Sequence, residues 1–234
     1  AEHEFEYQGS ADGKWQVSCR HVDTHIQGKG IIMETIPLYS KVFCTDSLDI
    51  DDEYFNDVRQ AVKNCDYTQT GLKESKSSLV HRDYKILDKP QFKLLGDMIL
   101  KLFTSFTKEQ LKISNDFKIS SSWLTKTEPN HESHYHRHYN CYYSGVLYID
   151  TDEGGEIIFD NMADERFLLN KVEDNDYNTR SFIFQTKNKM IIFFPSDIHH
   201  KIAENKTNKD RYSIAFNFYP IGNVGVSDSG VDIL

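Results

Sequence analysis

The second half of the sequence consists of short apolar segments separated by turn residues. Six segments have the length and the aromatic and β-branched content that are typical of strands. They are residues 117–124, 142–150, 155–160, 181–185, 189–194 and 211–219. Because no helical pattern alternates with these segments and no segment repeats, the sequence predicts antiparallel strands packed as a sandwich or a jelly roll.

Helical patterns precede the predicted strands. The clearest covers residues 90–106, where Pro90 suits the first turn and apolar residues recur at steps of three and four. These apolar residues are Phe92, Leu95, Met98, Ile99, Leu102, Phe103 and Phe106. A second helix is predicted for residues 47–62 and a further strand for residues 36–43. The predicted fold class is therefore mainly β with flanking α-helices, in which N-terminal helices buttress a cupin-like jelly roll.

The sequence also suggests how the chain is divided. Residues 1–32 are polar and rich in glycine, and Met33 would be a natural start, so we expect an added or loosely docked N-terminal extension. Residues 33–220 are expected to form a single jelly-roll domain with helical support, followed by a C-terminal tail in residues 221–234. The polar loop at residues 64–78 is long enough to line the mouth of a pocket.

Charge and composition narrow the range of partners. The 234-residue chain has a formal net charge of −9, which disfavours nucleic acid because phosphate binding needs clustered Lys and Arg. No apolar run approaches the roughly 18 residues of a membrane span, so no membrane partner is expected and a cytoplasmic location is the default expectation. The four scattered cysteines fit reduced thiols better than disulfides. A homodimer is left open.

Alternating histidines stand directly before the predicted strand at residues 142–150. His134, His136 and His138 would project from one strand face, and imidazole is the commonest side-chain ligand of iron, copper, nickel and zinc. His200 follows the apolar segment that ends at Phe194, and strands distant in sequence are neighbours in a jelly roll. The pattern predicts a metal site of His136, His138 and His200, with His134 in reserve. The alternative is a solvated strand edge and a surface turn.

The last predicted strand carries Arg211 and Ser213 on one face. Burying a guanidinium without a carboxylate partner is unfavourable, and the hydroxyl of Ser213 can donate to the same carboxylate. The pair predicts a receptor for a dicarboxylic acid whose other end reaches the metal. Strand parity adds Asn217 to this face and places Asn140 and Tyr148 on the face of the histidines. The alternative for Arg211 is a surface salt bridge.

Together these motifs resemble a family of 2-oxoglutarate- and Fe(II)-dependent oxygenases within the non-haem iron dioxygenases. The family pattern reads H-x-H-x-N with SGVYY, then G-x-L/I-x-F, F-P-S-x-x-x-H and R-x-S-x-x-F-N. This sequence has HRHYN at residues 136–140 with SGVLY at 144–148, GEIIF at 155–159, Phe194-Pro195-Ser196 through His200, and Arg211, Ser213, Phe216 and Asn217. The resemblance extends from about residue 36 to residue 220, with several motifs in order.

The resemblance implies a double-stranded β-helix with Fe(II) held by His136, His138 and His200. It implies that Arg211 and Ser213 bind the far carboxylate of 2-oxoglutarate. The cofactor-binding residues are completed by Asn140, Tyr148 and Asn217. The distal ligand is His200 and not His199, because the histidine of the family is the fifth residue after the proline.

The implied reaction is that of a hydroxylase. Oxygen and 2-oxoglutarate would be consumed, a C–H bond of an unidentified substrate oxidised, and succinate and carbon dioxide released. A peptidyl substrate rests on analogy of fold alone. His138 occupies the position where the wider superfamily has Asp or Glu. Two alternatives therefore stay open: a three-histidine, cupin-like dioxygenase that does not use 2-oxoglutarate, and a non-enzymatic metal-binding β-sandwich.

Overall fold

The computed structural model describes residues 5–9, 15–19, 40–81, 83–151, 155–162, 170–175 and 177–234. The chain divides into two compact units, Ala1–Leu38 and Tyr39–Leu234. In the first unit, strands β1 (Phe5–Gly9) and β2 (Trp15–Cys19) form an antiparallel pair. The rest of the N-terminal extension expected at residues 1–32 lies outside the described residues, as do the first four residues of the strand expected at 36–43.

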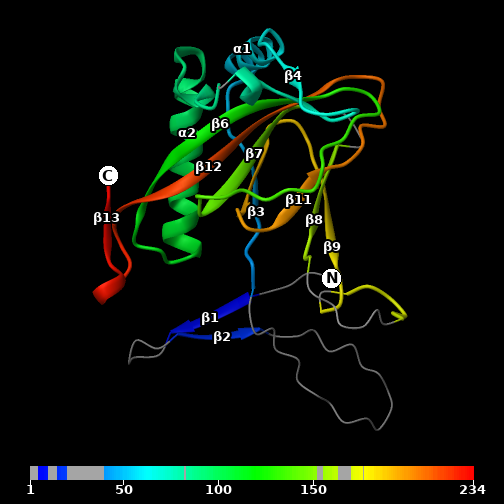
Figure 1. Cartoon of the computed structure of the whole chain (residues 1–234). Coiled ribbons are helices and arrows are strands. Elements are labelled where there is room, and N and C mark those ends of the chain that lie inside the picture. Colours follow the sequence, from blue (N-terminus) through cyan, green and yellow to red (C-terminus); the bar gives the residue numbers. More distant parts are fainter. Residues whose placement is uncertain are drawn as a thin grey trace. The chain divides into compact units, whose positions relative to one another are not determined.

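The second unit is built on two antiparallel sheets (Figure 1). Its strands are β3 (Cys44–Ser47), β4 (Thr68–Gln69), β5 (Lys76–Ser77), β6 (Asp116–Thr127), β7 (Tyr143–Asp150), β8 (Glu156–Asp160), β9 (Ser181–Gln185), β10 (Met190–Pro195), β11 (His199–Ile202), β12 (Arg211–Val224) and β13 (Val231–Ile233). The larger sheet has the order β3-β10-β7-β12-β6-β5-β4, with β13 paired to β12, and the smaller has the order β11-β8-β9. The predicted mainly β fold with strands distant in sequence side by side is confirmed.

Residues on the larger sheet alternate between two environments. On β12, Ile214, Phe216 and Phe218 belong to a core shared with the helices, whereas Ser213, Ala215 and Asn217 line a cavity on the opposite face. β10 follows the same rule, with Ile191 and Phe193 in the helix-side core and Ile192 and Phe194 packed with residues of β8. The period of two along β10 and β12 thus gives each of these strands one face in the helix-side core and one face toward the smaller sheet.

Two helices cover the outer face of the larger sheet (Figure 1). Helix α1 (Asp52–Lys63) begins later than the residue 47 expected from sequence, because Ser47 still belongs to β3 and the carboxylate of Asp51 caps the helix by accepting N–H bonds from Glu53 and Tyr54. Helix α2 (Lys93–Ser105) follows a 3-10 turn at Pro90–Phe92 and ends in a π turn at Phe106–Gln110. Of the apolar residues predicted for it, Leu95, Ile99 and Phe103 are buried and Met98 and Leu102 are partly buried, while Phe92 and Phe106 are buried in the flanking turns.

Several strands were not predicted from the sequence. β4 and β5 lie in the polar loop expected at residues 64–78, no strand was predicted where β11 lies, and residues 221–234 were expected as a tail. Instead β12 continues to Val224 and β13 folds back onto it, with Val224 opposite Val231. Residues 40–43, expected as strand, are not in one, and pairing begins only at Cys44. Short polar strands have little apolar periodicity, so whether they form depends on the strands with which they pair.

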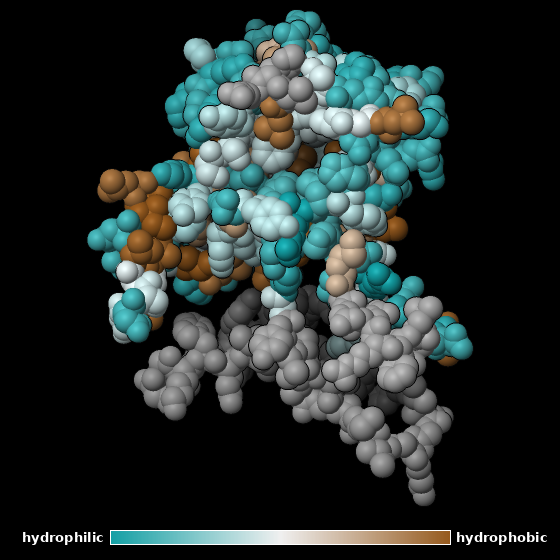
Figure 2. Space-filling model, in the orientation of Figure 1, coloured by the Kyte–Doolittle hydropathy of each residue, from teal (hydrophilic) through white to brown (hydrophobic). Residues whose placement is uncertain are grey.

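The surface agrees with the composition. Hydrophilic residues predominate over the described part of the face drawn in Figure 2. No helix among the described residues is long and apolar enough to cross a membrane. Among the described side chains, Cys44, Cys65 and Cys141 are free thiols.

Candidate metal and cosubstrate site

A cavity of about 470 Å³ lies between the two sheets. Its walls come from β6, β7, β8, β11 and β12, and they include Trp123, Val146, Ile157 and Ala215. The mouth is lined by the segment around β4 and β5, including Thr70, Ser75, Lys76 and Ser77. The loop expected to border a pocket therefore does so.

Three histidines converge on one point of this cavity. One ring nitrogen from each of His136, His138 and His200 lies within 4.8 Å of the others. Paired backbone hydrogen bonds hold two of them: the N–H of His136 donates to the carbonyl of His200 at 3.0 Å, and the reverse bond is 2.9 Å long. The pairing of distant segments predicted from sequence thus brings these imidazoles together. His199, next to His200 in β11, is not part of the cluster.

Hydrogen bonds orient each of the three rings. Nδ1 of His136 lies 3.0 Å from the carbonyl oxygen of His134, and Nδ1 of His200 lies 2.9 Å from that of Ile198. Carbonyl oxygens only accept, so both rings carry their proton on Nδ1. Nδ1 of His138 is also hydrogen-bonded, to side chains. The Nε2 lone pairs are thus left free, as a divalent metal requires, and the donor set fits Fe(II).

Burial keeps these imidazoles neutral. Desolvation lowers the pKa of His138 to about 4 and that of His200 to about 3, from an ordinary value of 6.5, and positive charge on His136 would lower both further. The pKa of His136 is also lowered, chiefly by burial. A neutral imidazole is the form that binds a metal, so the cluster is ready for one at neutral pH without first losing protons.

These shifts predict acid sensitivity of the metal-free protein. The unfolded chain takes up protons at histidines below about pH 6.5, whereas folded His138 and His200 resist protonation until about pH 4 and 3. The free energy of unfolding should therefore fall as pH drops from 7 to 5, by about 2 kcal/mol for each such histidine. Urea unfolding of chelator-treated protein at both pH values measures the loss. H199A should lose as much stability between pH 7 and 5 as the parent, and His200→Gln should lose less. An equal change in the free energy of unfolding in the two variants would contradict the low pKa assigned to His200.

The side chain of Arg211, at the start of β12, is a buried cation. Arg211 is 5% exposed, and its Nη1 has no hydrogen-bond partner. The hydroxyl of Tyr148, 3% exposed, is also unpartnered, and burial raises its pKa so that it stays a donor. Burial lowers the pKa of Arg211, as expected for a guanidinium without a counterion, and within the described residues no carboxylate forms an ion pair with it.

Gly155 lies beside Arg211 and Thr186. A Cβ on Gly155 would lie 3.4 Å from Cζ of Arg211 and 2.7 Å from Oγ1 of Thr186. Ser213 is buried and lines the cavity two residues from Arg211. An unpartnered guanidinium and hydroxyl beside a serine form a donor set that a carboxylate would satisfy. The residues present therefore fit the distal carboxylate of 2-oxoglutarate.

The remaining predicted residues are placed differently. Tyr148 and Asn217 line the cavity, as expected from strand parity. Asn140 does not: its side chain is exposed, and its φ of 56° takes the chain out of the extended conformation at this residue. His134 lies at the mouth, where its Nδ1 is 3.2 Å from a carboxylate oxygen of Glu74, and it is outside the three-histidine cluster.

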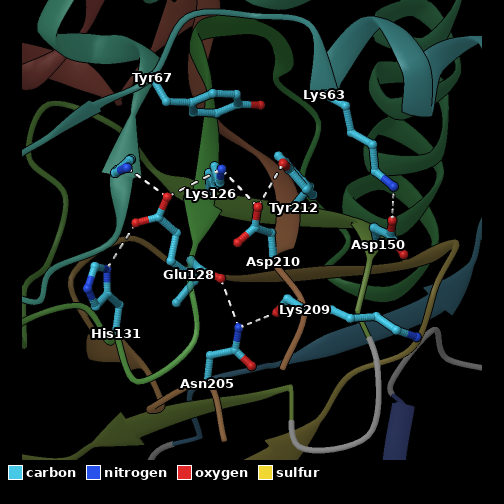
Figure 3. Close-up of polar contacts among 12 residues, drawn as sticks. Lys63, Tyr67, Lys126, Glu128, His131, Asp150, Asn205, Lys209, Asp210 and Tyr212 are labelled. Carbon is cyan, nitrogen blue, oxygen red and sulfur yellow. Dashed lines mark hydrogen bonds and ion pairs between the residues drawn. The ribbon is translucent and has the colours of Figure 1, made fainter. Parts of the chain in front are cut away.

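A network of ion pairs links β5, β6 and the residue before β12 (Figure 3). Glu128 follows β6, and its carboxylate lies 2.7 Å from Nζ of Lys76 on β5 and 3.4 Å from Nζ of Lys126 on β6. Lys126 also lies 2.8 Å from the carboxylate of Asp210, which immediately precedes β12. These ion pairs tie the mouth segment to the strand that carries Arg211.

Sequence reasoning gave no role to several residues of the site. Ser144 and Ser196 are buried next to His138, and their hydroxyl oxygens are 2.8 Å apart. Trp123 lies edge-on to His138, with ring centroids 5.3 Å apart. The two serines stand inside the motifs that carried the resemblance, which was the available signal. Ser144 and Ser196 are 52 residues apart, and His138 and Asn217 are 79 residues apart. Contacts over such separations cannot be predicted from a local sequence pattern.

The sequence of this region is similar to a known family. Residues 121–217 match the model of the family described as "Putative 2OG-Fe(II) oxygenase". This segment contains the three clustered histidines, Arg211, Ser213 and Asn217. The family implies Fe(II) as cofactor, 2-oxoglutarate and oxygen as cosubstrates, and oxygenase chemistry. No curated protein sequence matches the chain.

Several solved structures have a similar fold. HygX from Streptomyces hygroscopicus, with nickel, 2-oxoglutarate and hygromycin B bound, has a TM-score of 0.56 and 13% identity over 77% of this chain and 83% of that chain. A Pseudomonas putida prolyl-4-hydroxylase has a TM-score of 0.54 and 9% identity over 77% and 93%. A prolyl hydroxylase from Trichoplax adhaerens, in complex with a hypoxia inducible factor peptide fragment, has a TM-score of 0.53 and 12% identity over 76% and 83%. The predicted double-stranded β-helix is confirmed.

Proposed function

We propose that this oxygenase is a hydroxylase that holds Fe(II) with His136, His138 and His200. The observation that carries the proposal is the combination of three imidazoles within 4.8 Å and the unpartnered Nη1 of Arg211 in one region between the sheets. A metal chelator with a distal carboxylate satisfies both. This is the chemistry of 2-oxoglutarate, whose 2-oxo acid end binds metal.

Each part of the site has a role in this reaction. Bound Fe(II) and 2-oxoglutarate supply the oxidation, in which decarboxylation to succinate is coupled to transfer of oxygen to a C–H bond. Arg211, Tyr148 and Ser213 hold the distal carboxylate and so orient the cosubstrate. Three histidine ligands leave other coordination positions open. The apolar walls exclude water around the reacting groups.

We propose a peptidyl substrate. Two similar folds belong to prolyl hydroxylases, one of them with a peptide fragment bound. The cavity in this chain is lined by Thr70, Lys76 and Ser77, next to β4, the last strand in the order of the larger sheet. A strand at the end of a sheet is the kind of element to which an extended peptide can add. HygX was solved with hygromycin B bound, so a small-molecule substrate is the alternative to be tested.

The proposed function is tested first without substrate. Anaerobic addition of 2-oxoglutarate to Fe(II)-loaded protein should produce a visible charge-transfer band, and admission of oxygen should yield succinate. Oxygen use without succinate would favour the cupin-like dioxygenase, and a tetrahedral zinc site indifferent to 2-oxoglutarate would favour a structural metal. A peptide library and hygromycin B should then be screened by mass spectrometry for addition of one oxygen atom. Oxidation of the small molecule alone would overturn the peptidyl assignment.

A further inference from the structure

The side-chain contacts of His138 differ from those of the other two histidines in the cluster. His136 and His200 direct Nδ1 at backbone carbonyls two residues earlier, at 3.0 and 2.9 Å. Among the described residues, no such contact with a backbone carbonyl is found for Nδ1 of His138, and the oxygen of His136 accepts the N–H of His200. Nδ1 of His138 lies instead 2.8 Å from Oδ1 of Asn217 and 2.8 Å from Oγ of Ser144. The orientation of this one ring therefore depends on side chains.

Neighbouring strands fix the amide of Asn217. On the sheet, Asn217 of β12 stands between Ser144 of β7 and Ser121 of β6. Its Nδ2 donates to Oγ of Ser121 at 2.9 Å, which turns Oδ1 toward His138. Oγ of Ser144 donates to the same Oδ1 at 2.7 Å, and its own lone pair accepts from Ser196, 2.8 Å away. Oδ1 is thus an acceptor on the His138 side.

An acceptor at this point decides which nitrogen of His138 carries the proton. With Oδ1 at 2.8 Å, the proton sits on Nδ1 and Nε2 keeps its lone pair toward the cluster. The other tautomer would place N–H where the metal must bind. Because asparagine is uncharged, it selects this tautomer without adding the negative charge that a carboxylate ligand or partner would bring.

We infer that Asn217 is a positioning residue: it holds His138 in the Nδ1-protonated tautomer and so makes this histidine competent as a metal ligand. The inference rests on the proposed metal site and deepens it. It also changes the role expected for Asn217 from contact with the cosubstrate to support of a ligand. Ser144 and Ser196 extend the same support from β7 and from the turn after β10.

The test compares two variants of nearly equal size. Asn217→Leu removes the acceptor, and we expect Fe(II) affinity, measured anaerobically by chelator competition, to fall about 10- to 100-fold. Asn217→Asp retains an acceptor and should hold Fe(II) at least as tightly as the parent. Asn223→Leu changes an exposed asparagine on the same strand and should leave affinity unchanged. Thermal unfolding of the metal-free proteins checks that each variant folds, and Asn217→Ala replaces the leucine variant if that one does not.

A second readout is independent of the metal. Nitrogen-15 correlation spectra of the metal-free protein report the protonated nitrogen of His138, which should be Nδ1 in the parent and in N217D but should shift toward Nε2 in N217L. The inference is overturned if N217L binds Fe(II) within threefold of the parent or retains the Nδ1 proton. A parent that binds no Fe(II) yet shows the tautomer switch would instead remove the proposed metal site and leave the selection of the tautomer by Asn217 standing.

Discussion

Arg211→Met is expected to abolish 2-oxoglutarate binding and at the same time to stabilise the cosubstrate-free protein. The guanidinium would form two charge-assisted hydrogen bonds to the distal carboxylate, each contributing roughly 1.5–3 kcal/mol, so their loss should weaken binding about 100-fold or more. In the absence of a ligand the same Nη1 is buried without a partner, and an apolar side chain of similar length removes a penalty of about 1–3 kcal/mol. Titration with 2-oxoglutarate and thermal unfolding measure the two effects.

The opposite signs distinguish a binding role from a structural one. Fe(II) content should survive in R211M, because Arg211 is not among the clustered ligands. Arg180→Met provides the matched control, since Arg180 is half exposed and lies 3.7 Å from Asp160. It should change neither cosubstrate binding nor, by more than about 0.5 kcal/mol, stability. If R211M bound 2-oxoglutarate as the parent does, the carboxylate would have to bind elsewhere.

His200→Ala should empty the metal site, whereas His199→Ala should leave it filled. The two residues are adjacent in β11, so their side chains point to opposite faces of the strand. His200 is buried in the cluster, with its ring centroid 4.4 Å from that of His136. Removal of a ligand should lower Fe(II) affinity beyond the roughly 100-fold loss typical of a supporting residue.

Iron stoichiometry after anaerobic loading and desalting separates the two outcomes. We expect close to full occupancy in H199A and almost none in H200A, even with excess Fe(II) during loading. Circular dichroism of both variants controls for folding. Equal occupancy would show that the register of β11 assigned to the metal site is incorrect.

The sequence predicted those features that depend on local spacing. Alternation of His136 and His138 needed only the period of an extended chain, and His200 was found by its distance from Pro195 in the resembling motif. The apolar stripe of α2 was read directly from steps of three and four residues. These predictions agree with the structure because each depends on the residue spacing within one short segment.

Features that depend on pairing between elements were missed. Asn140 was expected to continue the parity of the histidines, but a residue with φ of 56° breaks it. The strand character of β11 comes from pairing with β8 and the histidine segment, because its own sequence of four residues, His199–Ile202, has little strand signal. Asn217 and His138 are 79 residues apart in the sequence, and strand parity predicted only that both side chains point inward, not that they are in contact.

Along β7 and β12, the residues that stabilise the fold alternate with the residues that line the cavity. Residues such as Ile214 and Phe216 pack against the helices, whereas their neighbours Ser213 and Ala215 line the cavity. A substitution at a cavity position changes what the site accepts and leaves the packing on the other face in place. Natural selection for a new substrate and selection for a stable fold can therefore act on different residues of the same strand, which makes this scaffold adaptable without a loss of foldability.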